Sequence, residues 1–175
     1  MRHMWRSIRY QVKNMATNFD PIDIGIADPK KKAIADGLRE LLADTFTLYI
    51  KTFSFHWSVV GPTFLQLHLL FQEQYEDLAD AVDDIAERVR ALGFHPPGSM
   101  IEFIRLSAIK DSTGNPPPCT RMVAELAQDQ STIVKFIHEL IKKANAADDL
   151  PTIDLLTKRS QAHEKTAWKL RATMS

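Results

Sequence analysis

The sequence predicts an all-α protein, a four-helix bundle with one long connection between its second and third helices. Apolar residues recur in steps of three and four along four long segments, which is typical of helices that bury one face. A Gly-Pro turn separates the first two segments, whereas about 27 residues separate the second from the third, enough to span the bundle. With 175 residues, 45% of them hydrophobic, the chain can form one domain with a sizeable core.

The first helix is expected to begin at Asp28-Pro29, because aspartate is a good N-cap and proline suits the first helical position. Gly61-Pro62 ends it. We assign residues 1–27 to a partly basic N-terminal tail and 28–175 to the bundle domain. The apolar stripe of this first helix consists of Ile34, Leu38, Leu42, Phe46, Tyr49 and Phe53, and His56 continues it.

The second helix is expected between Thr63, which can cap it, and Leu92, with Gly93 in the position after the C-cap. Its stripe contains Leu67, Phe71, Tyr75, Leu78, Val82, Ile85, Val89 and Leu92.

The connection between the second and third helices, residues 94–118, is rich in proline and glycine around a short apolar segment, Met100 to Ile109. We expect that segment to form one small helix. Because the connection can return along the bundle, the second and third helices are predicted to be parallel.

The third helix is predicted from Thr120 to Ala146, and the chain breaks and restarts at Leu150-Pro151-Thr152. The third helix should turn inward Val123, Leu126, Ile133, Ile137 and Leu140. The last helix should turn inward Leu156, His163, Ala167, Leu170 and Met174.

Four residues of the first two helices have the side chains of metal ligands: His56, His68, Asp83 and Glu87. Asp83 and Glu87 are four residues apart, so they can share an ion. His56 and His68 lie five residues before and seven after Gly61, which places them at similar depths in a helical hairpin. His68 and Asp83, however, are separated by roughly 22 Å along one helix, and metal–ligand bonds are only about 2 Å long. The chain therefore offers two half-sites, one with two histidines and one with two carboxylates.

Two chains packed antiparallel through the second helix would bring opposite half-sites together. The midpoint between His68 and Glu87 is also the midpoint of the predicted helix, so a two-fold axis there would create two equivalent sites. Imidazoles with carboxylates and open positions suit Fe(II). The sequence has no Glu-x-x-His or His-Glu-x-x-His motif and no cysteine cluster.

Each ligand also has a structural interpretation. A histidine on an apolar face is commonly a hydrogen-bonded core residue, which is how we interpret His163 and His138. Asp83 and Glu87 could belong to a solvated face near Arg88.

The segments FHW at 55–57, VGP at 60–62, LH at 67–68 and D-x-x-A-E-R at 83–88 resemble the Dps family of mini-ferritins, as does TIDLLTKRSQAHEKTAW at 152–168. The resemblance implies a ferritin-like fold and a twelve-subunit shell. It implies ferroxidase sites between two-fold-related subunits, Fe(II) oxidation preferably by hydrogen peroxide, and storage of ferric mineral, which protects against oxidative damage.

The resemblance also implies roles for single residues. His56 and His68 would come from one subunit, and Asp83 and Glu87 from its partner. Trp57 would lie beside the site as a sink for oxidising equivalents, its alternative role being core packing.

Two further positions bear on iron. Many relatives have a carboxylate where this chain has Gln72, and because a neutral amide is a poor iron ligand, the second iron of each pair is expected to bind weakly or through water. Asp148, Asp149 and Asp154 resemble the region that lines the family's three-fold iron pores, and a solvated acidic loop is an equally good interpretation.

The alternative function is that of a DNA-binding, nucleoid-compacting structural protein. Residues 1–14 contain Arg2, Arg6, Arg9 and Lys13 and no acid. This tail is a mobile terminus, an upstream leader before a start at Met15, or a basic arm for phosphate backbones or anionic surfaces. Acids and bases balance at 22 each, Cys119 is the single cysteine, and no segment resembles a membrane span. We therefore expect a cytoplasmic protein with no membrane partner.

Overall fold

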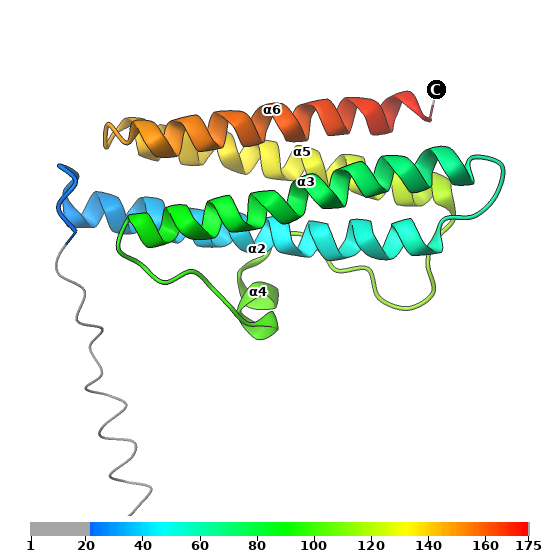
Figure 1. Ribbon diagram of the computed structural model, residues 1–175, viewed down its shortest axis with the longest axis horizontal. Coiled ribbons are helices and arrows are strands. Elements are labelled where there is room, and N and C mark those ends of the chain that lie inside the picture. Colours follow the sequence, from blue (N-terminus) through cyan, green and yellow to red (C-terminus); the bar gives the residue numbers. More distant parts are fainter. Residues whose placement is uncertain (1–21, 175) are drawn as a thin grey trace, which may run out of the picture.

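The computed structural model describes residues 22–174, and within this range the secondary structure is entirely helical. The helices are α2 (Asp28–Ser58), α3 (Phe64–Ala91), α4 (Met100–Leu106), α5 (Cys119–Asn145) and α6 (Leu150–Ala172) (Figure 1). The predicted all-α fold, with four long helices and one short helix in the crossover, is confirmed. The basic residues predicted to bind DNA lie outside the described residues.

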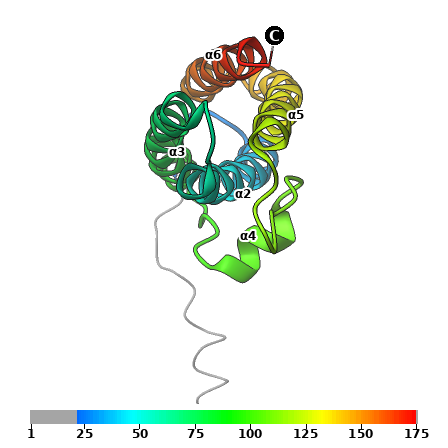
Figure 2. The same ribbon diagram turned by 90° about the vertical axis from the view of Figure 1, so that its right-hand side faces the viewer.

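The bundle consists of two antiparallel hairpins, α2 with α3 and α5 with α6. The hairpins pack with α2 against α5 and α3 against α6, so the four helices form a closed ring when viewed along the bundle (Figure 2). The connection after α3 returns along the bundle, and α3 and α5 therefore run in the same direction, as predicted (Figure 1). The short helix α4 lies outside the ring, against α2.

The core forms where the four apolar stripes meet. Burying one Leu, Ile or Phe side chain contributes roughly 1.5–3 kcal/mol, so these stripes supply most of the driving force for folding. At Gly37 the helices approach closely, since an added Cβ would lie 2.5 Å from Leu140 Cδ1. Met174 is exposed, contrary to prediction, because α6 ends at Ala172. The largest fully buried side chains include Ile34, Leu38, Leu48, Phe55, Phe71, Leu78, Ile85, Met122 and Leu126.

The helix ends agree with the prediction in one case and correct it in another. Gly93 has φ +91°, its N–H donates to the carbonyl of Arg90 (2.9 Å), and Phe94 N–H donates to the carbonyl of Val89 (3.1 Å). These two bonds form a Schellman motif, which needs a residue with positive φ after the helix. Asp28 is not the N-cap: Ala27 occupies that position, and Asp28 forms an ion pair with Lys31 at 2.8 Å. A carboxylate in the first turn still interacts favourably with the helix dipole.

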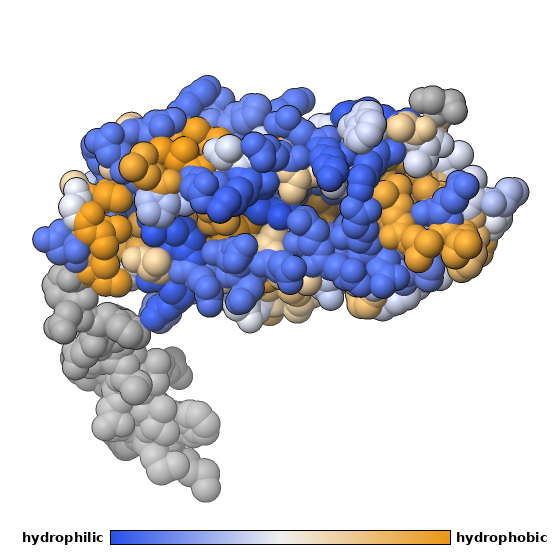
Figure 3. Space-filling view, turned by 45° about the horizontal axis from the view of Figure 1, so that its top comes forward, coloured by the Kyte–Doolittle hydropathy of each residue, from blue (hydrophilic) through white to orange (hydrophobic). Residues whose placement is uncertain are grey.

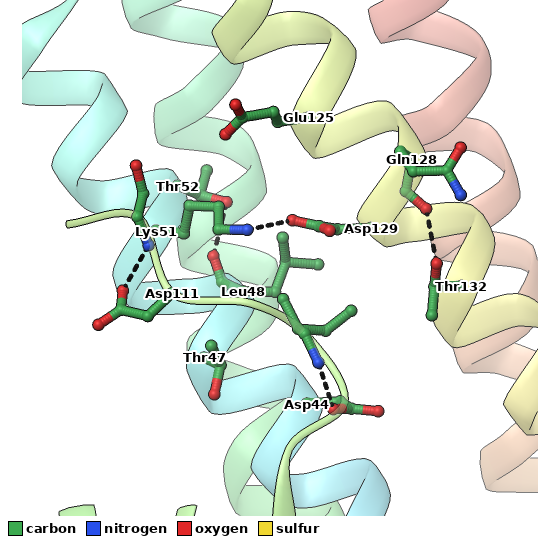
Figure 4. A network of polar contacts seen from close by, with 12 residues as sticks. Asp44, Thr47, Leu48, Lys51, Thr52, Asp111, Glu125, Gln128, Asp129 and Thr132 are labelled. Carbon is green, nitrogen blue, oxygen red and sulfur yellow. Dashed lines mark hydrogen bonds and ion pairs between the residues drawn. The ribbon is translucent and has the colours of Figure 1, made fainter. Parts of the chain in front are cut away.

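Buried polar side chains anchor the crossover to the bundle (Figure 4). Asp44 of α2 accepts hydrogen bonds from the Ser107 hydroxyl (2.8 Å) and the backbone N–H groups of Ala108 (2.6 Å) and Ile109 (3.2 Å). Burial raises the pKa of Asp44, and these bonds offset only part of that rise. The anchor fixes the chain immediately after α4, so the rest of the connection follows α2 and α5.

Candidate metal site

The two histidines of the predicted half-site lie side by side where the α2–α3 hairpin turns. His56 is in the last turn of α2, and His68 is in the second turn of α3. Their imidazole rings are stacked, with centroids 3.7 Å apart and ring planes inclined by 21°. The prediction that His56 and His68, at similar depths from the turn, meet across the hairpin is therefore confirmed.

A reciprocal pair of hydrogen bonds fixes both rings. The Nδ1 atom of His56 lies 2.8 Å from the backbone oxygen of His68, and the Nδ1 atom of His68 lies 3.0 Å from the backbone oxygen of His56. Because a carbonyl oxygen can only accept, each Nδ1 must carry the hydrogen. In the neutral ring Nε2 then has the free lone pair that a metal requires.

Aromatic side chains surround the histidine pair. Tyr75 packs edge-on against His56, with centroids 5.2 Å apart, and Phe64 lies 5.0 Å from His68. Trp57 packs on Phe53 with centroids 4.3 Å apart, but it is 66% exposed in the single chain. Core packing within the chain, the alternative role considered for Trp57, is therefore excluded.

The two carboxylates of α3 form a separate pair. Asp83 and Glu87 are exposed, and neither accepts a hydrogen bond or forms an ion pair with any residue between 22 and 174. Arg88, expected as a neighbour on a solvated face, instead binds Asp149 and Thr152. The carboxylates are therefore unneutralised and available to a cation.

The single chain does not bring the two pairs together. Within the described range, no group of three or more His, Cys, Asp or Glu side chains is placed to hold one ion. This arrangement follows from the geometry of α3, since a straight helix separates His68 from Asp83 by roughly 22 Å. A site with all four ligands requires a second chain.

Gln72 and the three acids near the α5–α6 junction differ in their environments. Gln72 is half-buried, and its Nε2 donates to Glu76 Oε1 at 2.8 Å. Asp148 is exposed with φ +55°, and Asp154 is exposed and pairs with Lys158. For Asp148 and Asp154, lining a pore and forming a solvated loop both stay predictions, because both side chains are exposed.

Asp149 is a buried structural residue, and the interpretation of it as pore-lining or solvated is wrong. It is 1% exposed, caps α6 by accepting from the Thr152 N–H (3.2 Å) and hydroxyl (2.6 Å), and accepts from Arg88 Nη2 at 2.5 Å. Burial alone would raise the pKa of Asp149, but the bonds from Arg88 and Thr152 lower it below its usual value. Sequence reasoning missed this role, although the pattern Asp-Leu-Pro-Thr before an apolar run is a recognisable capping signal.

The core role expected for His163 and His138 is found for His163 only. His163 is buried, as expected, and its Nδ1 contacts Gln130 Oε1. His138 is exposed, not a core residue, and its Nε2 lies 3.4 Å from the Ser160 hydroxyl.

A cavity of about 660 Å³ lies between α2, α5 and the crossover, away from the histidines. Lys51, 4% exposed, crosses its floor to Asp129 at 2.6 Å (Figure 4). Burial raises the pKa of Asp129, and Lys51 partly opposes that rise. The charges of Lys51 and Asp129 therefore neutralise each other, so this cavity is a weaker candidate for a metal site than the two half-sites.

Comparisons with known proteins agree with this fold. A ferritin-like domain matches residues 35–175. A low temperature-induced protein of Nostoc sp. is 40% identical over 152 residues, 86% of this chain and 85% of its own length. DNA protection during starvation protein 2 of Bacillus anthracis is 33% identical over 144 residues, 82% of this chain and 98% of its own length.

Solved structures show the same similarity. A Dps protein from Vibrio cholerae, described as a member of the ferritin-like diiron-carboxylate proteins, superposes with a TM-score of 0.84 at 26% identity, covering 91% of this chain and all of the other. A Dps protein from Bacillus brevis superposes with a TM-score of 0.81 at 31% identity, covering 84% and 98%. The fold and sequence thus define a ferritin-like protein. Within that class, the chain belongs to the Dps family of mini-ferritins.

Proposed function

We propose that this protein is a ferroxidase and iron store, which oxidises Fe(II), preferably with hydrogen peroxide, and holds the ferric product inside a shell of identical subunits. The observation that carries the proposal is the histidine pair. Both Nδ1 atoms are bound to backbone carbonyls, so both Nε2 lone pairs are available to Fe(II). The unpaired carboxylates of Asp83 and Glu87 complete a ligand set that suits iron.

The site is assembled from two chains in this proposal. An antiparallel dimer through α3 would place His56 and His68 of one subunit opposite Asp83 and Glu87 of the other, twice per dimer. Exposed apolar side chains beside the histidines support a protein interface there, because contiguous apolar surface commonly marks one. Figure 3 shows such surface at the end of the bundle where α2 turns into α3. The exposed apolar residues of this end are Trp57, Val60, Phe64, Leu65 and Leu69.

Fe(II) is the substrate. Two Fe(II) ions each lose one electron, and hydrogen peroxide accepts both electrons and two protons to become two water molecules. The imidazoles and carboxylates bind the ions loosely enough for the oxidant to reach an open position. Trp57, which follows His56 in sequence and is 66% exposed, would donate an electron if an oxidising equivalent escapes the iron. A dodecamer built from six such dimers would store the mineral inside its shell.

The second iron position is weaker than the first in this proposal. Gln72 offers a neutral amide that is already bound to Glu76 at 2.8 Å. The exposed acids Asp148 and Asp154 are candidates for a cation path into the shell.

Anaerobic Fe(II) titration followed by hydrogen peroxide tests the proposal. Bound Fe(II) should be oxidised rapidly, and the variant His56→Ala/His68→Ala should lose fast oxidation while keeping its fold. Asp80→Ala, which removes an exposed acid of the same helix, is the matched control and should leave the rate unchanged. Equal rates in the histidine variant and the parent protein would contradict the proposal.

DNA binding is the second candidate function. It is supported by the names of relatives such as the DNA protection during starvation protein of Helicobacter pylori, which is 32% identical over 138 residues, and by the four basic residues of the tail. Deleting residues 1–14 should weaken DNA binding and flatten its salt dependence, because fewer counterions are released. If the truncated protein retains DNA as the full chain does, in gel shifts at two salt concentrations, DNA binding by the N-terminal tail is contradicted. This function would place the protein in the cytoplasm, on the nucleoid.

None of the described helices is long and apolar enough to cross a membrane.

A further inference from the structure

A group of buried polar side chains lies inside the bundle between α3, α5 and α6, away from the half-sites. Arg159 of α6 binds both carboxylate oxygens of Asp77 in α3, at 3.1 and 2.7 Å. These helices run in opposite directions (Figure 1), and Lys169 contacts Glu73 further along them. The two contacts set the register of α3 against α6, so Gln74 comes level with the part of α6 that contains His163.

Four nitrogen and oxygen atoms of this group have no hydrogen-bond partner in the described part of the protein. They are Nε2 and Oε1 of Gln74, Nε of Arg159 and Nε2 of His163. Gln74 is 4% exposed and His163 is 1% exposed. Native proteins pair nearly all of their buried polar atoms, because an unpaired one costs free energy. Four unpaired polar atoms in one region therefore indicate that a ligand binds there.

The chemistry of the four atoms restricts what that ligand can be. The Gln130 carbonyl oxygen contacts His163 Nδ1, so Nδ1 carries the hydrogen and Nε2 is an acceptor. Gln74 Oε1 is a second acceptor, whereas Gln74 Nε2 and Arg159 Nε are donors. An anion would meet two lone pairs, and a cation would meet two N–H groups. A small neutral molecule that both donates and accepts matches all four atoms.

Space is available beside Gln74. Gln74 and Asp77 line a cleft of about 310 Å³ whose other wall is α6, including Gln161 and Thr166. One water molecule occupies about 30 Å³ in the liquid, so the cleft can admit water to the Gln74 amide, from which it would continue inward to Arg159 and His163. We propose that Gln74, Arg159 and His163 form a binding site for ordered water, which joins α3 to α6 by hydrogen bonds inside the bundle.

The substitution Gln74→Met in the full-length assembled protein tests this site, because methionine has a similar shape without polar atoms. If water is bound, the substitution removes its partners, and the Tm should fall by roughly 2–6 °C. When Gln74→Met is combined with His163→Leu, the fall in Tm should be smaller than the sum of the falls in the two single variants, because both substitutions disrupt the same bound water. Gln161→Met, at the exposed rim of the cleft, is the matched control and should leave the Tm unchanged.

A high-resolution crystal structure of the parent protein supplies the direct measurement. Electron density within hydrogen-bond distance of Gln74 and of His163 Nε2, lost in the Gln74→Met variant, would confirm the site. A dry region in the parent protein would overturn the inference. A rise in Tm in the variant would overturn it as well, because removing orphaned polar atoms stabilises a protein.

Discussion

The rings of His56 and His68 are stacked 3.7 Å apart, and each donates its Nδ1–H to the backbone carbonyl of the other residue. The pair is therefore oriented before any metal arrives, which reduces the ordering that binding requires. The carbonyl oxygens belong to the ends of two helices, so the turn between α2 and α3 sets the geometry of the ligands.

We predict that both histidines are Nδ1–H tautomers at neutral pH. Nitrogen-15 NMR of the protein labelled at histidine should show an unprotonated Nε2 in each ring, and these resonances should shift when a diamagnetic divalent metal is added. The exposed His138 is the internal control, since it should show no such shift. A protonated Nε2 in either ring would remove the basis for iron binding by the pair.

Gln72 is predicted to limit the second iron. Gln72→Glu should tighten the second Fe(II) bound per site in an anaerobic titration, because it adds a charged oxygen ligand one turn from His68. Glu73→Gln, which changes the neighbouring side chain that contacts Lys169, serves as the control and should leave both affinities unchanged. Two equally tight ions per site in the parent protein would show that water or another residue already supplies the missing ligand.

Protonation of His163 is predicted to destabilise the protein in acid. Burial lowers the pKa of His163 from 6.5 to about 3, with a smaller contribution from Arg159. Because the folded pKa lies below the unfolded one, the full contribution to stability is present above pH 6.5 and is lost as the pH falls toward 3. The slope is up to about 1.4 kcal/mol per pH unit.

Urea unfolding between pH 7 and 5 would measure this slope at fixed protein concentration. Asp44 and Asp129, whose pKa values burial raises above 3.8, give an opposite trend that His163→Gln retains. The contribution of His163 is therefore the difference between the slopes of the two proteins, and the slope attributed to His163 should be absent from His163→Gln. An equal slope in both proteins would assign the acid sensitivity to other groups.

Asp149 is predicted to be a stability residue. Asp149→Ala removes three accepted hydrogen bonds and leaves Arg88 without its carboxylate partner, so the free energy of unfolding should fall by about 3–5 kcal/mol. Asp154→Ala removes an exposed acid of the same region and should change stability little. Thermal unfolding compares the two. Equal, small effects would show that Asp149 is not a structural anchor.

The helices and the histidine pair could be predicted from the sequence because both depend on local spacing. Periodicity identified the stripes of α3 and α5, and similar distances from Gly61 paired His56 with His68. The role of Asp149 could not be predicted in full, because its partner Arg88 lies 61 residues away. Arg88 and Asp149 meet only because tertiary packing sets the register of α3 against α6.

The buried polar group was missed for a related reason. Gln74 lies between apolar stripe residues of α3 and has no motif, so its burial depends on how α6 packs over it. Trp57 lies in the last turn of α2, and its 66% exposure likewise depends on which helices pack over that turn.

The central claim is that each ferroxidase site is shared by two chains, and complementation between variants tests it most directly. One variant is His56→Ala/His68→Ala and the other is Asp83→Ala/Glu87→Ala. Each alone should lose fast Fe(II) oxidation, because every site lacks half of its ligands. A mixed dimer contains one site with both halves damaged and one site with intact histidines from one chain and intact carboxylates from the other.

Fe(II) oxidation by purified mixed dimers, or by assemblies built from them, is the measurement. The shared-site account predicts that activity returns, to at most one working site per mixed dimer. Mixed dimers as inactive as the two parent variants would contradict it.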